Sequence, residues 1–228
     1  MKIYAHRGYS QKFPEGTKTA YLEAVKAGAD GFECDVRLTR DKQIVCFHDR
    51  TLRRVAGKAG VISKLPLSEL KTKFDILTLE ELLDIAISSK KDLLIETKHP
   101  VQSGGEIESA VVSLLNSRKA EIESSNIEII VMSFSFLAVR RLRKIYPNVM
   151  KVIKYRFSWW LNSDTQVAVN IELLRRQKVL QHLKKKRILV WTANQKEELL
   201  IAEEMKAEGV ITDAVKQAFS TLKPSSGI

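Results

Sequence analysis

Five short polar clusters in the first hundred residues bring together side chains that could do chemistry. Each cluster lies at or near the end of an apolar run that is typical of a β-strand. Together they supply two imidazoles, several carboxylates, an arginine and a lysine, which suits a metal-assisted acid–base site acting on a phosphate. The clusters are His6-Arg7-Gly8, Pro14-Glu15-Gly16-Thr17, Glu33-Cys34-Asp35, His48-Asp49 and Glu96-Thr97-Lys98.

Three of the carboxylates form a candidate metal site. Side chains alternate across a strand, so Glu33 and Asp35 share one face of theirs, and Glu96 takes a similar place on the next strand. Carboxylates buried together are costly unless a cation compensates them. Oxygen ligands without a cysteine or histidine cluster favour a hard cation, Mg²⁺ or Ca²⁺. The alternative is a network of ion pairs with nearby cationic residues, namely Lys98, Arg7 and Arg37.

Two histidines are candidates for proton transfer. His6 ends the first strand-like run, and His48 ends the run after the Glu33–Asp35 pair. Placed on either side of a phosphate, they could act as general acid and general base. Arg7 can bind a phosphate oxygen in bidentate fashion, and pairing with Glu15 or Glu33 would not exclude this role.

The elements that must position these residues alternate between strands and helices. About eight strand-then-helix units can be counted if Ile44–His48 forms a hairpin beside the second strand. Such repeats predict a parallel sheet, and eight of them predict a closed (β/α)₈ TIM barrel. An open doubly wound sheet is the alternative, but no Gly-rich dinucleotide fingerprint follows the first strand. In a barrel, chemistry gathers at the C-terminal strand ends, where the following residues would lie: His6, Glu96, Ser133, Trp191 and Asp213.

Length and charge set further limits. We expect one domain over residues 1–222, with a small insertion at about 50–77 after the second strand and a frayed tail at 223–228. The net charge of +11 attracts anions, but no nucleic-acid-binding motif is present. Without a signal peptide or a membrane-spanning run, the sequence predicts a soluble, cytoplasmic protein. Cys34 and Cys46 are expected to be buried free thiols.

Taken in order, these motifs resemble the glycerophosphodiester phosphodiesterases. The resemblance is densest between His6 and Asp49, and it covers nearly the whole chain. Beyond the clusters above, it includes Arg53 after His-Asp, a Thr-Leu-Glu-Glu-Leu stretch, and the segments Val190–Asn194 and Gly209–Asp213.

The resemblance implies a TIM barrel with a small insertion and hydrolysis of glycerophosphodiesters to glycerol 3-phosphate and an alcohol. By position, it implies a divalent metal on Glu33, Asp35 and Glu96. It implies His6 and His48 as the acid–base pair. It also implies residues that bind phosphate or support the metal, namely Arg7, Glu15 and Lys98. Trp191 could stack on glycerol carbons or fill the top of the barrel.

Some features leave alternatives open. Gly16 stands where the family usually has Asn, which puts rate and substrate preference in question. The aromatic residues Tyr155, Phe157, Trp159 and Trp160 could form an apolar wall for a lipid-like group or pack a helix. A phospholipase D-like hydrolase acting on lysophospholipids, with transient membrane contact, is therefore one alternative. A barrel that binds phosphodiesters without hydrolysing them is the other. The oligomeric state is not predicted.

Overall fold

Eight parallel strands close into a barrel in the computed structural model, which describes residues 1–101, 104–154, 165–176, 183 and 185–223. Pairing of the first strand with both the second and the last closes the sheet. The predicted TIM barrel is therefore confirmed. The parallel strands are β1 (Lys2–His6), β2 (Gly31–Leu38), β4 (Asp92–Thr97), β5 (Ile129–Ser133), β6 (Val149–Ile153), β7 (Gln166–Asn170), β8 (Arg187–Trp191) and β9 (Gly209–Thr212).

Alternation along these strands separates an outer core from the barrel interior. In β2, Phe32, Cys34 and Val36 pack outward against the helices, while Glu33 and Asp35 take the other face. The lower barrel interior is filled by a second apolar cluster: Tyr4, Leu94, Ile130, Met132, Met150, Val152, Ala168, Leu189 and Ile211. On β1, β4 and β8, the residue two places after the apolar one also faces inward, and these residues are His6, Glu96 and Trp191. The apolar floor and the polar mouth are thus set by one alternating pattern.

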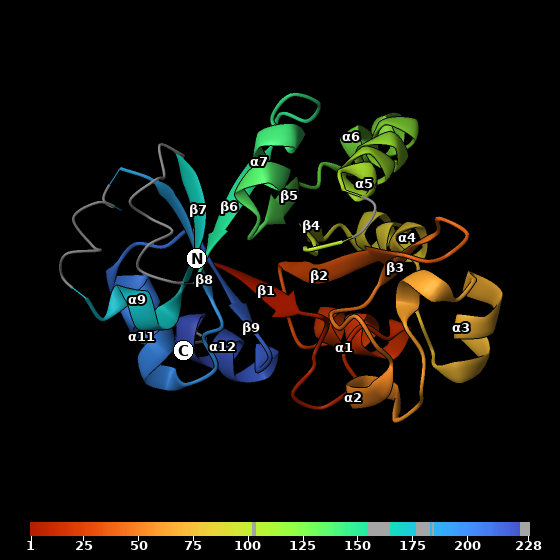
Figure 1. Ribbon diagram of the computed structural model, residues 1–228. Coiled ribbons are helices and arrows are strands. Elements are labelled where there is room, and N and C mark those ends of the chain that lie inside the picture. The colour runs from red at the N-terminus through yellow and green to blue at the C-terminus, as the bar shows by residue number, and fades with distance from the viewer. Residues whose placement is uncertain (102–103, 155–164, 177–182, 184, 224–228) are drawn as a thin grey trace.

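Helices surround the strands (Figure 1). They are α1 (Lys18–Lys26), α4 (Leu79–Ser89), α5 (Glu106–Ser117), α6 (Lys119–Ser125), α7 (Phe136–Leu142), α9 (Ile171–Leu174), α11 (Lys196–Glu204) and α12 (Val215–Leu222). Thr17 caps α1, and Thr78 caps α4 in a capping box with Glu81. The sequence predicts a helix from Asn170 to Lys185; the structure describes α9 at its start, and residues 177–182 and 184 lie outside the described part.

The cap of α11 lies one residue beyond the place that the local sequence indicates. Asn194 and Glu197 have the spacing of a capping box, but Gln195 and Glu198 form it at the start of α11. The Asn194 side chain is occupied elsewhere, since its amide donates to Asp213 Oδ2 over 2.7 Å. A long-range contact has therefore displaced a locally plausible cap.

The segment after β2 forms a small hairpin and a side structure. β3 (Ile44–Cys46) pairs antiparallel with β2, as expected for a hairpin. The segment that follows, here called the insertion, holds α2 (Arg53–Ala56), the 3₁₀ helix η1 (Ile62–Lys64) and α3 (Leu67–Lys73), which lie together beside the hairpin (Figure 1). Its own apolar cluster includes Leu52, Ile62 and Leu70. The domain boundary at residue 222 stays a prediction, and residues 224–228 lie outside the described part.

Other sequence expectations have mixed outcomes. Cys34 and Cys46 are buried free thiols, as predicted. None of the helices in the described ranges is both long and apolar enough to cross a membrane. Two arginines of the basic runs at 140–144 and 185–187 form ion pairs. Arg141 binds the buried Glu108, and Arg187 binds two glutamates at the base of the barrel.

Candidate active site

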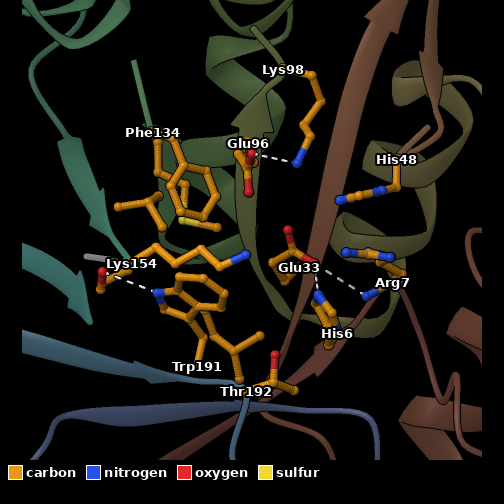
Figure 2. A pocket seen from close by; sticks show the side chains of 14 residues that line it. His6, Arg7, Glu33, His48, Glu96, Lys98, Phe134, Lys154, Trp191 and Thr192 are labelled. Atoms are coloured by element: carbon orange, nitrogen blue, oxygen red, sulfur yellow. Dashed lines mark hydrogen bonds and ion pairs between the residues drawn. The ribbon is translucent and has the colours of Figure 1, made fainter. Parts of the chain in front are cut away.

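A cavity of about 390 Å³ opens at the C-terminal ends of the strands and brings most of the predicted site residues together. Seven of those residues line it: His6, Arg7, Glu33, His48, Glu96, Lys98 and Trp191. Figure 2 shows His6, Arg7 and His48 on one side of Glu33, with Phe134 and Trp191 on the other. The two remaining predicted residues, Asp35 and Glu15, contact Arg7 from outside this lining.

Local backbone geometry explains the His6-Arg7-Gly8 motif. His6 is the last residue of β1, and the chain then turns sharply through Arg7 (φ 57°) and Gly8 (φ 84°). A Cβ atom on Gly8 would lie 2.7 Å from Ala20 of α1, so only glycine lets that helix pack here. Arg7 tolerates its left-handed conformation because its backbone N–H donates to the Glu33 carbonyl over 3.0 Å.

Each of the two histidines is held by a carboxylate through Nδ1. His6 Nδ1 lies 2.7 Å from Asp213 Oδ1, and His48 Nδ1 lies 2.6 Å from Asp49 Oδ1. Both carboxylates are ionised, so Nδ1–H is the donor in each pair and Nε2 is left as the reactive nitrogen. Burial lowers the pKa of His48, although the nearby Asp35 charge opposes this. A neutral His48 can therefore exchange a proton near neutral pH.

The sequence did not indicate that Asp213 would bind His6, although it placed Asp213 at a strand end. Asp213 follows β9, and it also accepts hydrogen bonds from Ser10 Oγ and Asn194 Nδ2, each over 2.7 Å. Burial opposes its ionisation, but the hydrogen bonds from His6, Ser10 and Asn194 outweigh burial and hold its pKa well below the ordinary value. The residues of this network come from opposite ends of the chain, so no local motif could reveal it.

Glu33, Asp35 and Glu96 converge as the alternation predicted. Each offers an oxygen within 4.8 Å of the others, and all three side chains are buried. Burial and the Asp35 charge raise the pKa of Glu33 well above its ordinary value and that of Glu96 to about 8. Burial also disfavours the charge on Asp35, but Lys98 and Arg7 outweigh it and lower its pKa. The three carboxylates therefore cannot all be ionised at neutral pH without a further cation beside them.

Those two cations bind the cluster from opposite sides. Lys98 Nζ lies 2.7 Å from Glu96 Oε1 and 3.1 Å from Asp35 Oδ1. Arg7 Nε lies 2.8 Å from Asp35 Oδ2, but without hydrogen-bond geometry, so that oxygen is buried with no donor. Arg37, the third cation considered, instead donates to the His48 carbonyl over 2.9 and 2.8 Å.

A second, outer network ties the insertion to the site. Arg54 of α2 donates to both oxygens of Glu15 over 2.7 and 2.8 Å, and its Nε donates to Asp49 Oδ2 over 2.6 Å. Arg7 Nη1 also donates to Glu15, over 3.1 Å. The hydrogen bond from Arg54 lowers the pKa of Asp49 to about 2. The motif analysis singled out the adjacent Arg53, so the arginine that reaches the site is one residue further along.

The opposite half of the cavity is largely apolar. The Phe134 and Trp191 rings meet edge to face with centroids 5.2 Å apart, and Trp191 Nε1 donates to the Ala168 carbonyl over 3.2 Å. Phe134 and Lys154 also line this half but were missed, because nothing in their local sequence marks them. The four aromatic residues expected to form an apolar wall, at 155, 157, 159 and 160, lie outside the described residues.

Gly16 lies directly behind His48 and Arg7. Its φ is +73°, a conformation that glycine adopts freely and asparagine tolerates better than most residues. Its backbone N–H donates to the Arg7 carbonyl over 2.9 Å, so the glycine supports the turn that carries Arg7. A Cβ atom here would lie 3.1 Å from the Cys46 carbonyl, a tight but adjustable contact. The left-handed backbone explains why Gly and Asn are alternatives at this position.

The mouth of this TIM barrel holds a carboxylate cluster, two carboxylate-bound histidines, and an arginine and a lysine that can bind a phosphate. Together these features define a hydrolase of phosphate esters. The model of the Glycerophosphoryl diester phosphodiesterase family matches residues 6–217. The chain belongs to this family and is a phosphoric diester hydrolase of the glycerophosphodiester phosphodiesterase class.

Individual relatives agree with this assignment. The chain is 36% identical over 188 residues to "Probable glycerophosphodiester phosphodiesterase 1" of Mycobacterium tuberculosis, covering 73% of this chain and 69% of the relative. A glycerophosphodiester phosphodiesterase structure from Thermotoga maritima superposes with a TM-score of 0.81 at 28% identity, covering 97% of each chain. An Oleispira antarctica phosphodiesterase, solved with the product sn-glycerol-3-phosphate, has the same fold, with a TM-score of 0.79 at 21% identity, covering 97% of this chain and 96% of its own.

Proposed function

We propose that this enzyme hydrolyses glycerophosphodiesters to glycerol 3-phosphate and an alcohol, using a divalent metal, Mg²⁺ or Ca²⁺, and His6 and His48 as general acid and base. The observation that carries the proposal is the convergence of the two histidines on the Glu33–Asp35–Glu96 cluster (Figure 2). Glycerol 3-phosphate as product agrees with the ligand of the Oleispira antarctica structure.

The residues present fit a divalent cation. Glu33, Asp35 and Glu96 would hold it, since they offer oxygen donors only, within 4.8 Å of one another. Asp35 Oδ2 is buried without a hydrogen-bond donor, as expected of an oxygen intended for a metal. When bound, the cation would supply positive charge that neutralises the phosphate and stabilises the transition state.

The chain's own residues account for the remaining steps. Arg7 and Lys98 bind phosphate oxygens and orient the diester in the mouth. One histidine accepts the proton of the attacking hydroxyl through Nε2 as a new O–P bond forms. The other donates a proton to the alcohol oxygen as the old P–O bond breaks. The attacking hydroxyl is that of the neighbouring glycerol, so the first product is a cyclic phosphate, which water then opens.

Release of glycerol 3-phosphate by the purified protein tests this proposal against its alternatives. We expect glycerophosphocholine to be hydrolysed, activity to disappear in excess chelator, and Mg²⁺ or Ca²⁺ to restore it. Activity on lysophospholipid with little on glycerophosphocholine would favour the phospholipase D-like alternative. Binding without turnover would favour the non-catalytic barrel, and full activity in excess chelator would exclude a metal. The cytoplasmic location stays a prediction.

Asp35→Asn tests the metal site separately from turnover. The neutral amide keeps the shape of Asp35 but removes a charge, so metal affinity should fall about tenfold or more while the fold persists. Calorimetric titration with Mg²⁺ or Ca²⁺ measures the affinity, and thermal melting checks the fold. An affinity equal to that of the parent protein would remove Asp35 from the ligand set.

A further inference from the structure

A second cavity of about 590 Å³ lies between the β2–β3 hairpin, the insertion and the loop that follows β4. Apolar residues such as Leu38, Ile62 and Ile107 form part of its lining, and no acidic residue lines it. We call this cavity the basic groove, because its lining includes five cationic residues: Arg37, Arg40, Lys42, Arg50 and Lys64.

Three of these cations have no acidic partner. Arg40, Arg50 and Lys64 are exposed, and across the described ranges none of them forms an ion pair with a carboxylate. Asp41, next to Arg40 in the chain, accepts hydrogen bonds from a threonine hydroxyl and a backbone N–H instead. Arg54 of the same insertion behaves differently, since it binds two carboxylates. The groove therefore concentrates positive charge that the protein does not neutralise.

The basic groove lies next to the candidate active site. Arg37 follows Asp35 by two residues on β2, so it lies on the same strand face, roughly 7 Å further toward the barrel mouth. Its guanidinium donates to the His48 carbonyl, which links the groove to the wall of the active-site cavity. Other lining residues, Pro100 and Val101, follow the end of β4. Both cavities therefore lie at the C-terminal end of the barrel.

Uncompensated arginines around a partly apolar hollow suit a phosphate on a short carbon chain. The active-site cavity accounts for one phosphate, that of the scissile diester. We propose that the basic groove binds a second phosphate group, carried by the alcohol part of the same substrate molecule. This inference rests on the proposed function and narrows its substrate class. Glycerophosphodiesters whose alcohol is itself phosphorylated are then the preferred substrates.

Paired substrates test the inference directly. One is the diester of two glycerols, and the other is the same diester with a phosphate on its terminal hydroxyl. The variant Arg50→Gln with Lys64→Gln should lose about tenfold in kcat/KM on the phosphorylated substrate, because two charge-assisted contacts are removed. On the unphosphorylated diester it should match the parent. The control pair Arg53→Gln with Lys58→Gln removes the same charge from the insertion outside the groove lining, and it should change neither value.

Calorimetric binding of both diesters keeps this inference distinct from the proposed function. If neither diester is hydrolysed but the groove variant still binds the phosphorylated one more weakly, the proposed function fails and the phosphate site stands. Equal kcat/KM losses on both substrates, or no loss in kinetics or binding, would overturn the inference. Loss of binding to phosphatidylglycerol vesicles without substrate discrimination would also overturn it, because the phosphate recognised would then be a lipid headgroup.

Discussion

At the residue scale, two histidines reach the same arrangement by different routes. His48 takes its carboxylate from the next residue, Asp49, whereas His6 takes Asp213 from the far end of the chain. In both, the fixed Nδ1–H leaves Nε2 as the nitrogen that can exchange a proton. The two pairs are alike in form, so the roles of acid and base should separate when the leaving group changes.

We expect His6→Ala and His48→Ala each to lower kcat by at least ~10²-fold on glycerophosphocholine, because each removes one proton-transfer group. The two variants should separate on a p-nitrophenyl diester, whose leaving group needs no proton. The variant lacking the acid should regain most of its activity there, and the variant lacking the base should not. Steady-state kinetics on the two substrates measures this, with thermal melting to check the fold. A variant as active as the parent would remove that histidine from the mechanism.

At the element scale, α2 of the insertion acts on the barrel site through one side chain. Arg54 binds Glu15, which in turn binds Arg7, and it binds Asp49, which orients His48. Arg54 is half exposed, so its ion pairs add little stability. Its effect should therefore fall on the positioning of the site.

Arg54→Gln should lower kcat by about tenfold without changing the melting temperature by more than about 2 °C. Without the arginine, the pKa of Asp49 rises from about 2 toward its ordinary value of 3.8, so the acidic limb of the activity profile should move to higher pH. Arg53→Gln is the matched control, since it removes the same charge from the same helix. An Arg54→Gln profile that overlays that of Arg53→Gln would show that α2 plays no part in the site.

Whether the sequence could predict a feature of the site depended on how far apart in the chain the contacting residues are. Alternation along β2 and β4 was sufficient to predict the convergence of Glu33, Asp35 and Glu96, because the period of two is a local property of strands. Asn194 looked like a helix cap, but its contact with Asp213 is made across two loops. Phe134 lines the cavity only because β5 lies beside β4 in the closed barrel. Such contacts depend on the packed fold, so no local pattern indicates them.

At the scale of the whole molecule, the two ends of the barrel use charge differently. At the mouth, Asp35 Oδ2 lacks a hydrogen-bond donor and several cations of the basic groove lack an ion-pair partner among the described residues, whereas at the base the charged groups are paired. There Arg187, at the start of β8, binds Glu128 over 2.7 and 2.6 Å and also binds Glu208. These partners precede β5 and β9, so one guanidinium on β8 joins its neighbour β9 and β5, which lies three strands away. None of the site residues in the described part of the chain lies at this end, and its ion network should serve stability alone.

Replacing Arg187 by Met should therefore lower the free energy of unfolding by about 1–3 kcal/mol, because Glu208 loses its ion-pair partner and Glu128 keeps only Lys2 and Asn148 among the described residues, while kcat stays unchanged. The hydrogen bond from Arg187 lowers the pKa of Glu128 below its ordinary 4.5, so this stabilisation is complete above pH 4.5 and is lost as the pH falls through the lowered value. Urea unfolding at pH 7 and at acidic pH should show that the difference in unfolding free energy between parent and variant becomes smaller as the pH falls. Arg140→Met, on an exposed face of α7, is the control and should not change stability. A difference in unfolding free energy that is constant with pH would contradict the role of Glu128. A fall in kcat in the Arg187→Met variant would mean that the base of the barrel does more than stabilise the fold.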